Sequence, residues 1–300
     1  MSCVAALPRR PLSGTFSGSP SFRLTGVGSR KRAPMAEVLA DAAIQLASAI
    51  ETDRRYFELG ANIEQLPGAS LAWMPGLTSA PAAAVIQRVD PETVATEGKP
   101  RLSRAEQALS GIGCQMARVY FDRRHPASEQ LFREAGYEER EELIFAHSLG
   151  PPEPGLSMAR VESASDWDRK LQLQQIMTTP PDGHSTDPAD WIALERRKCG
   201  AGMEMYLAEI DGEAIGAIGA IRGDGLLRLK NIAVHPSHRR TGVGLRMLGH
   251  LGEISRERGI SEQCVFAVRG EIGELLYRAA GMRIIGSVIE WSKPLGEHNR

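Results

Sequence analysis

One segment, residues 226–257, constrains the fold of this 300-residue chain more than any other. It opens with an apolar, strand-like run at 226–234, and Pro236 then prevents that run from continuing as a central strand. After a glycine-rich stretch, leucines recur at helical spacing until Gly259, a residue type that suits the left-handed position after a helix. The order strand, glycine loop, helix is a unit of α/β folds. The loop consists of Arg239, Arg240, Thr241, Gly242, Val243 and Gly244.

The composition of this loop predicts an anion-binding site. Glycines let successive backbone N–H groups turn toward one point, and the helix N-terminus adds about half a positive charge there. Arg239 and Arg240 add two full charges, so a pyrophosphate is the anion that fits best. The spacing R-x-x-G-x-G lacks the Gly-Lys-Ser/Thr ending of a P-loop and differs from the dinucleotide fingerprint G-x-G-x-x-G.

The segments around the loop add strands in a regular order. Asp211-Gly212 separates two strand-like runs and predicts a hairpin. Further strands are expected at 263–268 and 284–291. The C-terminal half is therefore predicted to be an α/β domain.

With these elements in place, residues 203–291 resemble the GNAT superfamily of N-acetyltransferases. The loop R-x-x-G-x-G, after a strand ending Ile-Ala-Val-His-Pro, looks like the acyl-CoA signature of that superfamily. The sequence LYRAAGM at 276–282 is similar to its L-Y-x-x-x-G-F element, and the segments 166–177 and 187–198 fit its first two helices. The resemblance implies a mixed, mostly antiparallel sheet flanked by helices. Two positions depart from the pattern: Gly270 stands where the family often has Asn, and Met282 replaces the usual Phe.

The resemblance implies direct transfer of an acyl group from acetyl-CoA, as co-substrate, to a primary amine of a small molecule or of a protein. Backbone groups near Ala233 and Val234 would hold the pantetheine arm and polarise the thioester carbonyl, and loop 239–244 would hold the phosphates. Tyr277 would act as general acid, because a phenol is protonated at neutral pH. No metal is implied. The segment 178–186 would border the acceptor site.

The general base stays open at this stage. The strand at 226–234 carries no carboxylate, so water that relays the proton to bulk solvent is one alternative. The acidic run at 138–142 is interpreted as the solvated start of a strand. The carboxylates that are candidates by position alone are Glu204, Glu209 and Glu290.

Two other classes of function fit the same motifs. One is a non-catalytic regulatory or scaffold protein that binds acyl-CoA, and the other is a GNAT-fold enzyme that carries out another reaction of an acyl-CoA, such as decarboxylation. The substitution Tyr277→Phe separates the first of these from an acyltransferase. An acyltransferase would lose activity and keep its affinity for CoA, whereas a binding protein would be indifferent.

An internal repeat extends the interpretation to the N-terminal half. At a shift of 145 residues, positions 129–137 share five identities with the segment that contains Tyr277. We therefore predict two tandem GNAT-like domains, a degenerate one at 35–150 and a catalytic one at 151–300, each with its own sheet. The degenerate copy loses the chemical residues: Val94, Glu97, Lys99 and Phe132 stand where the second copy has Arg239, Gly242, Gly244 and Tyr277.

Composition sets the remaining limits. Residues 1–34 hold six Arg and Lys residues and no Asp or Glu, and are predicted to be a disordered basic tail or a targeting segment. A net charge of −1 and 5 % aromatic residues argue against a nucleic-acid partner. The absence of a long apolar run argues against a membrane span, and four scattered cysteines fit a reduced, cytoplasmic protein. The oligomeric state is left open.

Overall fold

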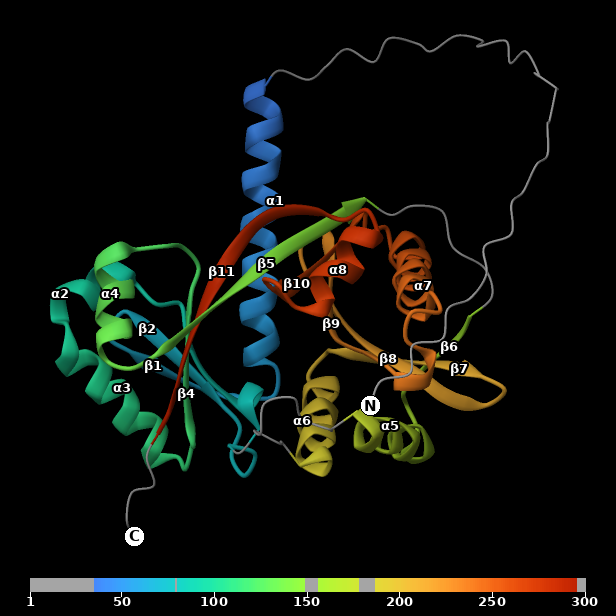
Figure 1. The fold of residues 1–300 in the computed structure, drawn as a ribbon, viewed down its shortest axis with the longest axis horizontal. Helices are drawn as coiled ribbons and strands as arrows, with labels where there is room; N and C mark the ends of the chain where they lie inside the picture. Colours follow the sequence, from blue (N-terminus) through green and yellow to red (C-terminus); the bar gives the residue numbers. More distant parts are fainter. Residues whose placement is uncertain (1–34, 79, 149–155, 178–186, 296–300) are drawn as a thin grey trace, which may run out of the picture.

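The computed structural model describes residues 35–78, 80–148, 156–177 and 187–295. Within these residues, eleven strands form one continuous mixed sheet, in the order β1-β2-β3-β4-β11-β5-β10-β9-β8-β7-β6 (Figure 1). The strands are β1 (Asn62–Leu66), β2 (Ala69–Trp73), β3 (Ala84–Gln87), β4 (Met116–Phe121), β5 (Glu138–Ser148), β6 (Ser157–Arg160), β7 (Glu204–Ile210), β8 (Glu213–Arg222), β9 (Leu226–Val234), β10 (Glu262–Val268) and β11 (Arg283–Pro294).

The two halves share this sheet because they exchange their last strands. Strand β5, the last of the N-terminal half, pairs with β10 of the C-terminal half, while β11, the last of the chain, lies between β4 and β5. Figure 1 shows β5 and β11 as two long neighbouring strands between the halves. The prediction of a separate sheet for each half is therefore wrong. Strands β5 and β11 alternate in the same way, so each could pair with the strands of either half. The sequence pattern alone therefore does not tell which half each strand joins.

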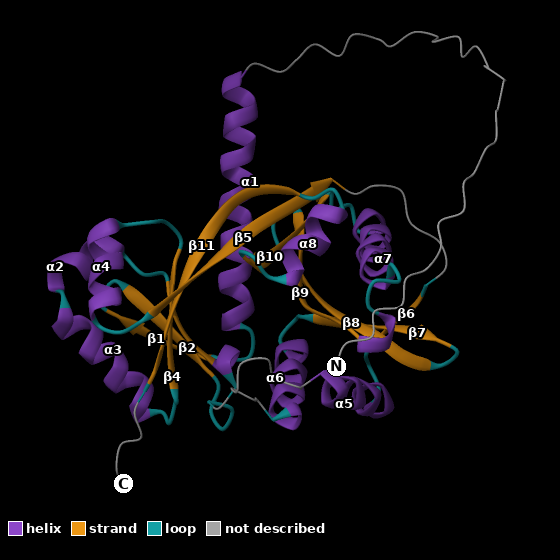
Figure 2. Cartoon of the chain, in the orientation of Figure 1, coloured by secondary structure: helices purple, strands orange, loops and turns teal. Residues whose placement is uncertain are grey.

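Helices cover both faces of the sheet (Figure 2). One face packs against α1, α5 and α6 around a core that includes Tyr56, Trp167 and Ile192. On the opposite face, α7 and α8 cover the C-terminal strands, and α2, α3 and α4 cover the N-terminal strands. The helices are α1 (Met35–Glu58), α2 (Pro91–Glu97), α3 (Lys99–Gly111), α4 (Pro126–Glu134), α5 (Ala164–Met177), α6 (Pro188–Gly200), α7 (Val243–Glu257) and α8 (Ile272–Ala279).

Helix α1 belongs to the N-terminal half but contacts both halves of the sheet. Toward the N-terminal strands, Glu51 and Glu58 both form ion pairs with Arg88. Toward the C-terminal strands, Asp53 forms ion pairs with Arg228 and Lys230 of β9. This helix therefore ties the two halves together across the middle of the sheet, where Figure 1 draws it in blue.

The repeated residues form the same local structure in both halves. Near the start of α4 and of α8, a glutamate, Glu129 or Glu274, accepts a hydrogen bond from a backbone N–H four residues earlier and pairs with the arginine four residues later. Past the end of each helix a glycine, Gly136 or Gly281, adopts a positive φ, which costs a glycine nothing. The five identities thus preserve a helix with its caps.

The strands and helices predicted for the C-terminal half are present. Asp211 and Gly212 both have positive φ and form the turn between β7 and β8, as the Asp-Gly pair predicts. Strand β6 was not predicted. The predictions for residues 1–34 and for the segment 178–186 lie outside the described residues. In the described part of the chain, no helix has the length and apolar character that a membrane crossing requires.

Candidate active site

Strands β9 and β10 separate partway along their length and leave a cavity. Their parallel pairing covers only three residue pairs, which end at Cys264 and Arg228. Beyond that point the strands diverge around a cavity of about 270 Å³. Its walls come from β9, from β10, from the start of α8 and from β5, the strand that the N-terminal half contributes. One edge of β9 pairs with β8 as far as Val234, so the other edge faces the gap.

Of the predicted site residues, Tyr277 lines the cavity, while Ala233 and Val234 continue β9 beyond the residues that line it. Ala233 and Val234 are half-buried at the end of β9, and a bulge in the β8–β9 pairing just before them leaves Asn231 with a φ of 53°. A non-glycine residue with positive φ is uncommon, and such strain gathers at functional sites. The bulge therefore re-aims the backbone of β9 where the cavity lies.

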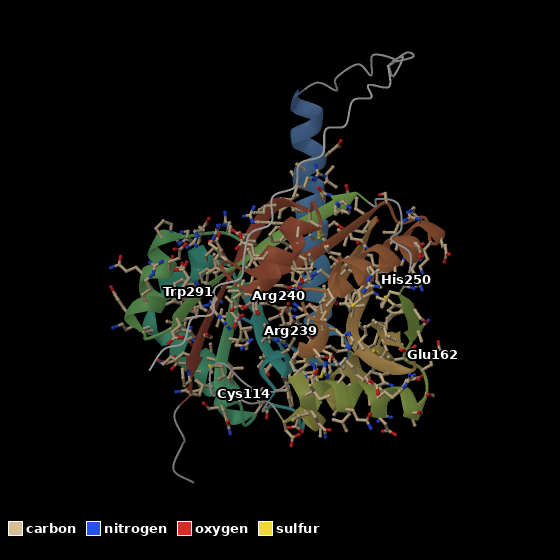
Figure 3. The ribbon with its side chains drawn as sticks, turned by 45° about the vertical axis from the view of Figure 1, so that its right-hand side comes forward. Cys114, Glu162, Arg239, Arg240, His250 and Trp291 are labelled. Carbon is tan, nitrogen blue, oxygen red and sulfur yellow. The ribbon has the colours of Figure 1, made fainter. Side chains whose placement is uncertain are left out.

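The glycine loop forms the start of α7. Arg240 and Gly242 have φ values of 63° and 82°, and no side chain caps the N-terminal N–H groups of the helix. Arg239 and Arg240 are exposed and are labelled in Figure 3. Arg239 also donates a hydrogen bond from Nε to the carbonyl of Val234, 3.2 Å away, which joins the loop to the end of β9. Uncapped N–H groups beside two arginines suit an anion.

The next two residues of the loop are buried, and Gly244 fits tightly. A Cβ atom at Gly244 would lie 3.1 Å from Cδ1 of Leu276, which belongs to α8. Val243 packs in the same core as Tyr277. The remaining loop residue, Thr241, is exposed and donates a hydrogen bond to the carbonyl of His238. The motifs around 239–244 and around Tyr277 are therefore in direct contact, although Gly244 and Tyr277 are 33 positions apart in the sequence.

Tyr277 lines the cavity from the side of α8. Its ring packs 5.6 Å from the ring of Phe145. Burial raises the pKa of the phenol to about 12, against an opposing effect of the Arg228 charge, so the hydroxyl is protonated at neutral pH. Gly273 lies beside it, where a Cβ would come within 4.0 Å of the hydroxyl. The phenol can therefore donate a proton to an atom in the cavity.

Buried charges line the opposite side of the cavity. The carboxylate of Asp53 accepts hydrogen bonds from Nη2 of Arg228 at 2.7 Å and from Nζ of Lys230 at 3.1 Å. The guanidinium of Arg228 lies 3.9 Å from the centre of the Phe266 ring. Burial alone would raise the pKa of Asp53, but the charges of Lys230 and Arg228 outweigh it, so the pKa lies below its ordinary value. This cluster holds β9 and β10 against α1.

Of the predicted base candidates, the structure places none on the wall of the cavity. Glu204 accepts a hydrogen bond from Tyr206 and pairs with Arg258, and Glu209 pairs with Arg169. Both glutamates belong to β7, which is separated from the gap by β8 and β9. Glu290 is buried on β11, where it accepts a hydrogen bond from Tyr120. Their positions in the sequence gave no information on distance from the gap.

Two acidic residues do line the cavity, Glu142 of β5 and Glu271 just before α8. Glu271 pairs with Arg140 at 2.9 Å, whereas Glu142 forms no ion pair among the described residues. Glu142 is the last residue of the acidic run 138–142, which the sequence analysis interpreted as a solvated strand start. Alternation along β5 turns Glu142 and Ile144 toward the core under α1. The strand exchange then brings it to β10, and no signal in the sequence indicates that exchange.

The N-terminal half has a corresponding gap with different contents. Strands β3 and β4 share one residue pair, and an apolar cavity of about 150 Å³ lies beside them. Phe132, the counterpart of Tyr277, lines that cavity. Glu97, the counterpart of Gly242, pairs with Arg101 and Arg104. The carboxylate of Glu97 therefore pairs with two arginines of α3 in the N-terminal half. At the equivalent place the C-terminal half has the glycine loop, where no side chain caps the helix.

Comparisons with known proteins agree with this division. A sequence profile of the acetyltransferase (GNAT) family matches residues 168–278, which span the glycine loop and Tyr277. Residues 168–278 are thus similar to the GNAT acetyltransferase family. The profile match lies wholly in the C-terminal half. No curated protein sequence matches the chain.

Solved structures show the same fold over most of the chain. A conserved protein of unknown function from Staphylococcus epidermidis matches with a TM-score of 0.60 at 11 % identity, over 79 % of this chain and 95 % of that one. A GCN5-related N-acetyltransferase from Kribbella flavida matches with a TM-score of 0.55 at 16 % identity, over 86 % and 96 %. A tandem GNAT protein from the clavulanic acid biosynthesis pathway matches with a TM-score of 0.53 at 13 % identity, over 88 % and 97 %. At such low identity these likenesses establish the fold alone.

Among the described residues, no cluster of His, Cys, Asp and Glu side chains could hold a metal ion. The gap instead offers a protonated phenol and two acidic residues, Glu142 and Glu271, and the start of α7 offers uncapped N–H groups beside two arginines. That set suits a phosphate-bearing molecule whose other end enters the cavity.

Proposed function

We propose that the chain is an acetyl-CoA-dependent N-acetyltransferase with one working site, in the domain 151–300. The observation that carries the proposal is the joining of the uncapped glycine loop at α7 to the gap between β9 and β10. A molecule with phosphates at one end and a thioester at the other fits both parts at once. The acceptor is a primary amine of a small molecule or of a protein.

The residues have distinct tasks in this proposal. Arg239, Arg240 and the N–H groups of residues 241–244 bind the phosphates of CoA. Backbone groups of Ala233 and Val234, on the open edge of β9, bind the pantetheine arm and polarise the thioester carbonyl, which develops negative charge when the amine attacks. Tyr277 gives its proton to the sulfur of the leaving thiolate.

The N-terminal domain 35–150 binds no acyl-CoA in this proposal. Glu97 would repel a phosphate, and it already pairs with Arg101 and Arg104. Asp90 fills the N-terminus of α2, where its carboxylate accepts hydrogen bonds from the N–H groups of Glu92 and Thr93. The first domain therefore keeps the fold and takes no co-substrate of its own.

Substitution of Tyr277 tests the transfer reaction. We expect Tyr277→Phe to lower kcat at least about tenfold, because the thiolate then leaves without a proton donor. The affinity for acetyl-CoA should stay unchanged, since Phe132 shows that a phenyl ring fills the equivalent position in the fold. The measurement is release of free thiol from acetyl-CoA with a panel of diamines, amino acids and short peptides, beside a calorimetric titration.

Tyr206→Phe is the matched control. Tyr206 is also buried on the α7 side of the sheet, but it lies on β7, away from the cavity, and its hydroxyl donates a hydrogen bond to Glu204 of the same strand. It should not change the rate of transfer. If the wild-type protein binds acetyl-CoA and acetylates none of these amines, an acyl-CoA-binding regulator becomes the better account. Release of CO2 from an acyl-CoA substrate would instead indicate a decarboxylase.

A further inference from the structure

Strand exchange places one carboxylate of the N-terminal half in the wall of the C-terminal cavity. Glu142 of β5 stands in register with Val268 of β10 on one side and with Val288 of β11 on the other. Val268 is the last residue of β10, beyond the point where β9 diverges. The cavity is therefore lined by residues of both halves, with Glu142 opposite Lys230 and Asn231 of β9.

Glu142 and Tyr277 belong to opposite faces of the sheet. Along β5, Ile144 packs in the core under α1, and Glu142 shares its face. Leu143 and Phe145 pack in the core under α7 and α8, and Tyr277 lies in that same core. The gap between β9 and β10 connects the two faces. In a direct transfer the nucleophile approaches the carbonyl carbon from one side and the thiolate leaves on another, so two groups in these positions can serve the two steps.

The surroundings of Glu142 leave its carboxylate free for a ligand. The hydroxyl of Tyr120 of β4 lies 3.3 Å from it and 2.8 Å from Glu290, and has one proton for these two acceptors. The cations nearby have other partners: Arg228 and Lys230 of β9 both bind Asp53 of α1. Among the described residues, no Lys, Arg or His forms an ion pair with Glu142. A carboxylate in a cavity without a paired cation suits a ligand that carries an amino group.

The charges that face Glu142 make it a proton acceptor at neutral pH. Its pKa is raised to about 7. Burial is the largest cause, Asp53 of α1 and Glu290 of β11 also raise the pKa, and Lys230 and Arg228 of β9 lower it. Glu290 itself is paired with Arg118 of β4 at 3.2 Å. Catalysis by a general base is most efficient when its pKa lies near the working pH.

We propose that Glu142, from the N-terminal half, binds the acceptor amine and is the general base of the site in the C-terminal half. The acceptor loses one proton to water and enters as the neutral amine. Its nitrogen forms a bond to the thioester carbon, and the carbon–sulfur bond breaks. The proton lost by the nitrogen passes to Glu142, and the thiolate takes the proton of Tyr277. Exchange through solvent returns the proton from Glu142 to Tyr277, so that an amine and acetyl-CoA give an amide and CoA.

This inference rests on the proposed acyl transfer, and Glu142→Gln tests it. We expect kcat/KM for the amine at pH 7 to fall about 100-fold, within the usual range for loss of a general base. The ionisation near pH 7 should vanish from the pH profile, and Glu142→Asp should restore part of the activity. The affinity for acetyl-CoA and the melting temperature should be kept, because glutamine fills the same space without a charge.

Glu141→Gln is the matched control. Glu141 is the neighbour of Glu142 on β5, but it faces the other side of the sheet and pairs with Arg269. It should leave the rate and the pH profile as in the wild type. A wild-type protein that acetylates amines, beside a Glu142→Gln variant with the same rate and profile, overturns this inference and leaves the proposed function standing. A wild-type protein that acetylates no amine overturns both.

Discussion

Separation of the two halves is expected to leave neither able to fold alone. A fragment 151–300 keeps β10 but loses β5, with which β10 forms seven residue pairs. It also keeps β11 without either of its neighbours, β4 and β5. The N-terminal fragment loses Trp291, whose side chain is 0 % exposed in the core of that half, 5.4 Å from the ring of Phe132. Loss of one large buried aromatic residue alone costs about 3–5 kcal/mol.

Co-expression of the fragments 35–150 and 151–300 supplies the control. Each fragment alone should be aggregated or unfolded by size-exclusion chromatography and circular dichroism, because unpaired strand edges and apolar cores are left open. Together they should co-purify as a folded pair that binds acetyl-CoA. A fragment 151–300 that is monomeric, folded and binds acetyl-CoA by itself would contradict the importance of the exchanged strands.

Loss of Asp53 is expected to destabilise the protein by about 3–5 kcal/mol, since removal of one partner leaves a buried charge without compensation. Arg228 is 1 % exposed and has Asp53 as its carboxylate partner. Lys230 loses the same partner. The free energy of unfolding of Asp53→Ala, from urea denaturation, checks this value. Because Asp53 also holds α1 against β9, the affinity for the acceptor should fall with it.

Glu51→Ala on the same helix is the comparison. Glu51 is exposed and its pairs with Arg54 and Arg88 are solvated, so its loss should cost less than about 1 kcal/mol.

The pH dependence of stability adds a second test of the role of Asp53. The pKa of Asp53 is lowered on folding, so its stabilising effect is present above the unfolded value of about 3.9 and is lost as the pH falls through the folded value. The difference in the free energy of unfolding between the wild type and Asp53→Ala should therefore become smaller in acid. A difference below 1 kcal/mol at pH 7 would show that the ion cluster is not needed for stability.

The local structure of the C-terminal half could be predicted because it depends on near neighbours in the chain. The turn at Asp211-Gly212 requires a positive φ at both residues, and the start of α7 requires one at Gly242. Few residue types adopt a positive φ, so glycine and aspartate mark these turns in the sequence. The leucines of α7 recur at helical spacing, so the helix follows from the pattern. The contact of Gly244 with α8 gives a physical reason for a small residue at that position in the loop.

The parts that escaped prediction depend on pairing between distant strands. The exchange of β5 and β11 leaves every local pattern unchanged, since each strand keeps its alternation and only its neighbours change. Glu142 follows from that exchange. Read locally, the acidic run 138–142 resembles a solvated strand, and only the pairing with β10 brings its last residue to the cavity. Glu204, Glu209 and Glu290 were candidates by position alone, and none of them lines the gap, because distance from the gap is a tertiary property.

The central claim is one acyl-CoA site, formed at the glycine loop of the C-terminal half, and calorimetric titration of the 35–300 chain with acetyl-CoA tests it most directly. The informative variant is Gly242→Glu, which copies the carboxylate of the N-terminal half. The control is Gly259→Glu at the other end of α7, with a φ of 69° against 82° at Gly242 and with open space around both. Both variants carry the same charge and similar backbone strain. The account predicts one site in the wild type and in Gly259→Glu, and no measurable binding in Gly242→Glu. Two sites in the wild type, or full binding by Gly242→Glu, would contradict it.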